Sequence, residues 1–146
     1  MMRHLMRAAT VAATTAAVVT ATAVSALAAP STAATDSSFD VCGATCLGET
    51  WGSITWYNRT AYVNGYVWDS GAGSATALFE AFAGDTKIDT ETRTANDESD
   101  LGTLRAFDFT IGDPDLVGGI NRIRVTVCRN YQTSSQLCGD PEHFYR

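Results

Sequence analysis

The feature that most constrains this chain is a two-residue alternation of apolar and polar side chains, which runs in short stretches from Trp51 to the C-terminus. Successive side chains of a strand point to opposite faces, so this period predicts strands that are buried on one side. Clusters of turn residues, such as 69–73 and 112–119, separate the stretches. No ten-residue window has the spacing of an amphipathic helix. The chain is therefore predicted to be all-β.

Seven strands are expected, at residues 51–57, 60–68, 75–83, 86–94, 103–111, 120–130 and 135–145. Short strands at such spacings are typical of an antiparallel β-sandwich. The layout of residues 51–146 resembles the Ig-like or fibronectin-III-like modules of small secreted bacterial proteins. The resemblance is one of pattern, and it implies a fold and no activity.

One hairpin of this pattern is predicted in more detail. Gly84-Asp85 suits a two-residue turn, because glycine readily adopts the positive φ that tight hairpin turns need. In the strand that follows, four charged side chains alternate with threonine and isoleucine, and they are expected to face solvent: Lys87, Asp89, Glu91 and Arg93.

The N-terminal segment has the organisation of a secretory signal peptide. Arg3 and Arg7 precede an uncharged stretch rich in alanine, valine and threonine, and Ala26-Leu27-Ala28 has the small-residue pattern of a cleavage site. The alternative is a membrane anchor, but a spanning helix needs about 20 strongly apolar residues and this stretch is shorter and diluted by threonine. We expect residues 1–28 to be removed, 29–41 to be a flexible leader, and 42–146 to form one secreted domain that no membrane retains.

Charge excludes one class of partner. The whole chain has 146 residues and a formal net charge of −6. The signal peptide contains two of the ten basic residues and none of the sixteen acids, so the mature chain has a net charge of −8. Proteins that bind nucleic acids usually carry a basic patch, so nucleic acid is not expected as a partner.

Four cysteines lie in the mature part: Cys42, Cys46, Cys128 and Cys138. An even number in an exported chain predicts two disulfides. Pairing within each half, Cys42 with Cys46 and Cys128 with Cys138, is favoured because both loops are short, and the alternative joins the two halves. The spacing does not match a zinc site, which usually has two or four residues between its paired cysteines.

Few residues suit catalysis. His143 is the one histidine that remains after the signal peptide, and no serine lies in a nucleophile elbow, so a catalytic triad is not expected. Paired carboxylates could cleave glycosides without histidine, and the candidates are Glu80, Asp108, Asp97, Glu98 and Asp100. The acids at 97–100 and 113–115 also offer the oxygen ligands that Ca²⁺ prefers, but their spacing does not match an EF-hand. The favoured role of these acids is to form local hydrogen bonds in turns. No cofactor or metal is expected.

Aromatic residues are the strongest positive indication of function. Tyr62, Tyr66 and Trp68 share one face of a predicted strand with Asn64, and Trp56 lies just before it. The other face carries Val63 and Val67. Exposed rings on a sheet bind sugars or the apolar surface of a partner. The alternative is that these rings fill the core, since tyrosine and tryptophan are good strand formers; Trp56 in particular fits the core better.

These observations favour a monomeric, non-enzymatic extracellular module that binds a glycan, a cell-wall polymer or a protein through its aromatic face. The alternative is an inhibitor of a secreted hydrolase, which would present the Cys128–Cys138 hairpin with Tyr131 and Gln132 at its tip. A small carboxylate-dependent glycoside hydrolase is the least favoured function.

Overall fold

The structure is a computed structural model, and it describes residues 35–97, 102–131 and 135–146. The predicted signal peptide and the first part of the predicted leader lie outside these residues. The described residues contain nine strands and no helix: β1 (Thr35–Cys42), β2 (Gly48–Trp56), β3 (Thr60–Asp69), β4 (Gly73–Ala83), β5 (Thr86–Asp97), β6 (Thr103–Gly112), β7 (Arg122–Asn130), β8 (Gln136–Cys138) and β9 (Glu142–Tyr145). The predicted all-β class is confirmed.

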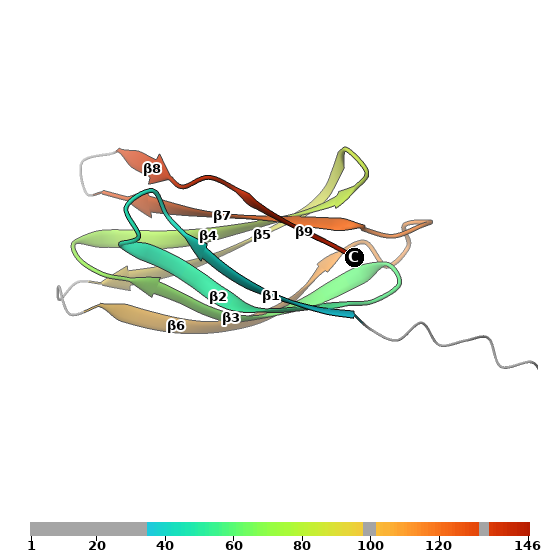
Figure 1. The fold of residues 1–146 in the computed structure, drawn as a ribbon, viewed down its shortest axis with the longest axis horizontal. Helices are drawn as coiled ribbons and strands as arrows, with labels where there is room; N and C mark the ends of the chain where they lie inside the picture. The colour runs from blue at the N-terminus through green and yellow to red at the C-terminus, as the bar shows by residue number, and fades with distance from the viewer. Residues whose placement is uncertain (1–34, 98–101, 132–134) are drawn as a thin grey trace, which may run out of the picture. The chain divides into compact units, whose positions relative to one another are not determined.

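The strands form two antiparallel sheets (Figure 1). The first sheet has the order β1-β2-β3-β6. The second has the order β5-β4-β7-β8, and β9 also pairs with β7, beyond the end of β8. Both sheets contribute to one hydrophobic cluster, in which the Phe79 ring of the second sheet lies 5.7 Å from Phe39 and 5.1 Å from Phe109 of the first. The two sheets therefore pack against each other through a shared core.

The predicted number of strands was wrong, since the described residues contain nine strands and not seven. One addition is β1, which pairs with β2 along its whole length and occupies residues 35–42, where a flexible leader was expected. Its Phe39 and Val41 are buried, but two apolar residues among polar ones are too weak a pattern to detect. The other addition arises because the predicted last strand is interrupted between β8 and β9.

The β4–β5 hairpin has the predicted turn. Ala83 pairs with Thr86 across Gly84-Asp85, and Gly84 has φ 60°. Beyond the turn the register shifts between Ala81 and Phe82, a β-bulge that leaves Ile88 unpaired. The bulge reverses the alternation of β5, because an extra residue moves each later side chain to the other face.

This reversal overturns the expected solvent-facing direction of three of the four charged residues in β5, whereas Lys87 precedes the bulge and is exposed as expected. Asp89, Glu91 and Arg93 lie opposite the inward-facing residues of β4. Because β5 is an edge strand, their side chains reach across the side of the core: the Arg93 guanidinium lies 4.3 Å from the centre of the Phe109 ring and pairs with Glu91 at 2.8 Å. Inward-pointing charges on an edge strand also oppose pairing with another chain.

Candidate functional site on the outer face of the first sheet

The outer face of the first sheet is built by the alternation of β3. Ala61, Val63 and Val67 are fully buried, so the side chains between them point away from the core. These are Tyr62, Asn64, Tyr66 and Trp68, the four residues of this strand that the sequence suggested as a ligand-binding row. The structure thus places the rings on the outside of the sheet and the valines in the core.

Trp51 of β2 completes this row. It lies directly opposite Tyr66, and the two rings stack with centroids 5.9 Å apart and planes 30° apart. Tyr66 is 43% exposed. The sequence analysis missed Trp51, although the polar residues at the next odd-numbered positions, Ser53 and Thr55, indicate that this face points outward. We call Trp51, Tyr62, Asn64, Tyr66 and Trp68 the aromatic face.

Trp56 does not belong to the aromatic face, contrary to its inclusion among the expected ligand-binding residues. Its side chain is only 2% exposed and lies in the core cluster. Its indole N–H donates a hydrogen bond to the Ser37 hydroxyl at 3.2 Å, which satisfies the polar atom of an otherwise buried ring. The reason is the pleat of β2, because Trp56 and Ile54 are two residues apart and share the inner face.

Hydrogen-bonding groups lie beside the rings. Ser53 is opposite Asn64, and its hydroxyl donates to the Asn64 side-chain oxygen at 3.3 Å. Thr55 is opposite Tyr62. The aromatic face therefore combines flat rings with amide and hydroxyl groups, as surfaces that recognise amphipathic ligands do.

Carboxylates surround the aromatic face. By register, Asp40 is opposite Trp51, Glu49 is opposite Trp68, and Asp108 is opposite Asn64. Partial burial raises the pKa of Glu49 above its ordinary value, and a hydrogen bond and charge repulsion involving Asp40 raise it further. Glu49 and Asp40 are thus close enough for their charges to interact.

A depression of about 510 Å³ adjoins this face at the edge of β1. Two acidic residues line it, Asp40 and Glu142 of β9, together with Trp51. Its remaining lining residues are Ser38, Phe39, Gly52 and Phe144.

The outer face of the second sheet has a different character. Glu80 is 5% exposed, and it accepts hydrogen bonds from Arg124 at 2.7 Å and Lys87 at 3.2 Å. Burial by itself would raise the pKa of Glu80, but these two cations outweigh burial and hold the pKa below its ordinary value. The Arg122 guanidinium lies 4.2 Å from the centre of the Phe82 ring. The ion pairs of Glu80 with Lys87 and Arg124 therefore connect β4 to β5 and to β7.

Of the five carboxylates suggested for catalysis, Glu80 and Asp108 lie on different sheets and do not meet. Glu80 lies on the outer face of the second sheet and Asp108 on that of the first. Glu98 and Asp100 lie outside the described residues, as does the side chain of Asp97. His143 is exposed, and its ring stacks with Tyr145 at 6.4 Å.

No group of three potential metal-ligating side chains was found among the residues that the structure describes. For the predicted calcium candidates, the carboxylate of Asp113 accepts a hydrogen bond from the Asp115 backbone N–H at 2.8 Å. This is the local turn contact that the sequence favoured.

A buried ion pair that the sequence analysis missed closes one end of the core. Arg129 is 4% exposed, and its guanidinium lies 3.1 Å from the carboxylate of Asp69, which is fully buried. The guanidinium also donates to the backbone carbonyls of Leu47, Ser70 and Ala72 at 2.9–3.1 Å. Arg129 of the second sheet thereby holds the end of β3 and two loops. The alternation of β7 predicts its inward direction, but nothing local to the sequence identifies its partners.

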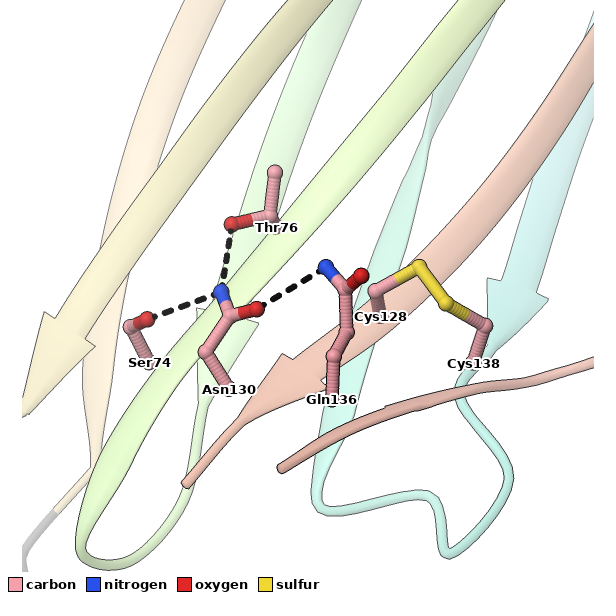
Figure 2. The surroundings of a disulfide bond; sticks show 6 residues. All are labelled: Ser74, Thr76, Cys128, Asn130, Gln136 and Cys138. Atoms are coloured by element: carbon pink, nitrogen blue, oxygen red, sulfur yellow. Dashed lines mark hydrogen bonds between the residues drawn. A yellow bond between two sulfur atoms is a disulfide. The ribbon is translucent and has the colours of Figure 1, made fainter. Parts of the chain in front are cut away.

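Both expected disulfides are present, Cys42–Cys46 and Cys128–Cys138. The second joins β7 to β8 (Figure 2). Beside it, the Asn130 amide donates to the hydroxyls of Ser74 and Thr76, and its oxygen accepts from Gln136, as Figure 2 shows. The base of the hairpin is therefore cross-linked both covalently and by hydrogen bonds. Gln132, expected at its tip, lies outside the described residues.

In the part of the chain that the structure describes, no helix has the length and apolar character to cross a membrane. Two disulfides in a small domain are compatible with an extracellular location. No protein-family model, curated protein or solved structure matches the chain.

Proposed function

We propose that the chain is a secreted, non-enzymatic binding module that holds an extracellular glycan, cell-wall polymer or protein on the aromatic face. The observation that carries this proposal is the stack of half-buried Trp51 on exposed Tyr66, on the outside of a sheet whose other side fills the core. Tryptophan and tyrosine supply large rigid contact areas at a small entropic cost, and grouped rings on a surface mark binding sites.

The proposed fold type is a β-sandwich of the Ig-like or fibronectin-III-like kind. The strand order supports it: β2-β3-β6 corresponds to strands A, B and E of the Ig arrangement, and β4-β7-β8 corresponds to C, F and G. In this correspondence β1 is an additional edge strand, and β5 pairs beside C. Such a frame would hold the aromatic face rigid from behind.

Secretion is part of the proposal. The signal-like N-terminus and the two disulfides both support it, since disulfides persist in oxidising compartments. Mass spectrometry of the protein in culture medium should give a chain that begins near Ala29 with both disulfides formed. Retention of the intact N-terminus in the cell would contradict this part.

The binding test uses the purified mature chain with insoluble polysaccharides in pull-downs and soluble oligosaccharides in tryptophan fluorescence titrations. Trp68→Ala and Tyr66→Ala are expected to weaken binding about tenfold, because a stacked ring contributes on the order of 1 kcal/mol or more. Tyr57→Ala is the matched control, since Tyr57 is an exposed tyrosine beyond the end of β2. No binding, together with no effect of Trp68→Ala, would remove the glycan version.

The second candidate is an inhibitor of a secreted hydrolase. The cross-linked base of the β7–β8 hairpin supports it, because inhibitors gain affinity from loops that are rigid before binding. Purified protein would be titrated against a panel of proteases and amylases. Stoichiometric loss of activity that Tyr131→Ala relieves is expected for an inhibitor, and unchanged rates at excess protein eliminate it.

A further inference from the structure

The outer face of the first sheet carries charge of one sign. Its outward positions in β1, β2, β3 and β6 are all described, and they include no lysine, arginine or histidine. They do include four carboxylates, which surround the aromatic face: Asp36, Asp40, Glu49 and Asp108. The charged side chains around a ligand that lies on these rings are therefore all negative.

This distribution is not a general consequence of an acidic chain. On the other sheet the outer face presents Arg122, Arg124 and Lys87, and its acid Glu80 is buried between two of them. The basic residues of the outward positions are thus collected on one sheet. Long-range attraction would bring cations to the first sheet and would keep anions away from it.

The depression beside the aromatic face has the chemistry of an ammonium site. Its lining residues include two acids, Asp40 and Glu142, and the tryptophan Trp51, and none of them is basic. An ammonium group is attracted by the face of an indole and by neighbouring carboxylates. Asp40 and Trp51 both line the depression and lie opposite each other in adjacent strands, so the depression borders the row of rings at Trp51.

We propose that the ligand of the aromatic face is a polysaccharide with free amino groups, held through its ammonium groups by Asp40 and Glu142 beside Trp51. This inference rests on the proposed binding function. Sugar rings would stack along Tyr66 and Trp68, while their hydroxyls meet the polar groups of Ser53 and Asn64. A basic peptide has the same charge, but peptides usually bind to a sheet edge or in a groove. The broad ring surface of a sheet face suits a sugar chain better.

The test compares three β-1,4-linked hexasaccharides of the same length: glucosamine, N-acetylglucosamine and glucose. Tryptophan fluorescence and titration calorimetry would be performed at about pH 6, where a sugar amine is protonated. We expect the glucosamine hexamer to bind about tenfold more tightly than the other two. Its binding should weaken as salt is raised, because these charges lie at the surface.

Two double variants separate a specific site from the overall charge of the chain. Asp40→Asn/Glu142→Gln should lose the preference for the glucosamine hexamer, a drop of about tenfold, and keep its affinity for the neutral hexamers. Asp85→Asn/Asp115→Asn removes the same charge from two exposed turns and should change nothing. An equal loss in both double variants would overturn the inference, since it would mean that only net charge attracts the ligand.

Other outcomes decide between occupants. Equal affinity for all three hexamers overturns the amino-sugar ligand and leaves the proposed glycan-binding function standing. If none of the hexamers binds and an oligolysine peptide does, the amino-sugar ligand is overturned in favour of a basic peptide. Sedimentation that shows a dimer broken by Tyr66→Ala overturns it in favour of a second copy of this chain on the aromatic face.

Discussion

Replacing Arg129 tests how much the buried ion pair contributes to stability. Arg129→Met keeps most of the apolar stem but removes the guanidinium, and with it four hydrogen bonds to Asp69, Leu47, Ser70 and Ala72. Removing one partner of a buried ion pair costs about 3–5 kcal/mol, mainly because the other charge stays buried. Small domains are stable by about 5–15 kcal/mol. The variant should therefore lose a large part of the free energy of unfolding.

The measurement is urea unfolding of the oxidised protein, followed by tryptophan fluorescence. A slope of roughly 1–3 kcal/mol per molar urea converts a loss of 4 kcal/mol into a midpoint about 2 M lower. The double variant Asp69→Asn/Arg129→Met should lose less free energy of unfolding than the two single variants lose together, because both single substitutions remove the same interaction. Arg59→Met is the control, since Arg59 is exposed and donates to Pro114 at the surface. A loss below about 1 kcal/mol for Arg129→Met would refute the reasoning.

Three further predictions concern the other charged and cross-linked positions. Glu80→Gln should lower the free energy of unfolding at pH 7 by about 1–3 kcal/mol. Because folding lowers the pKa of Glu80, this difference between the variant and the wild type should shrink as the pH falls below the ordinary carboxyl pKa. Urea midpoints at pH 7 and pH 3 measure it. Glu49→Gln should stabilise the protein at pH 7 by less than about 1 kcal/mol and reduce the loss of stability as the pH rises, because folding raises the pKa of Glu49; a destabilised variant would contradict this. Replacing Cys128 and Cys138 by alanine should cost about 3 kcal/mol from the sequence separation of 10 between them, which thermal unfolding would measure; the separation of 4 between Cys42 and Cys46 predicts about 2 kcal/mol.

Local patterns predicted the features that depend on neighbouring residues. The alternation of β3 placed Val63 and Val67 on one face and the rings on the other, and the structure has the valines in the core. Sequence proximity favoured both disulfides, and Gly84-Asp85 marked a turn. These features follow from the pleat of a strand, the closure of short loops and the φ of glycine, which a short segment shows by itself.

Features that depend on pairing between distant strands were not predicted. The bulge at Ile88 reversed the face of Asp89, Glu91 and Arg93 in β5, and one extra residue is visible only in the register with β4. β1 has a weak pattern of its own and became recognisable only through its pairing with β2.

The candidate site divides in the same way. The sequence by itself determined that Tyr62, Tyr66 and Trp68 share a face, because alternation is a property of one strand. Only the tertiary structure decided that this face points outward, that Trp51 stacks on Tyr66, and that Arg129 meets Asp69. The physical reason is that burial and contact depend on which strands pack together, and this is settled by the joint packing of the whole core rather than by any one segment.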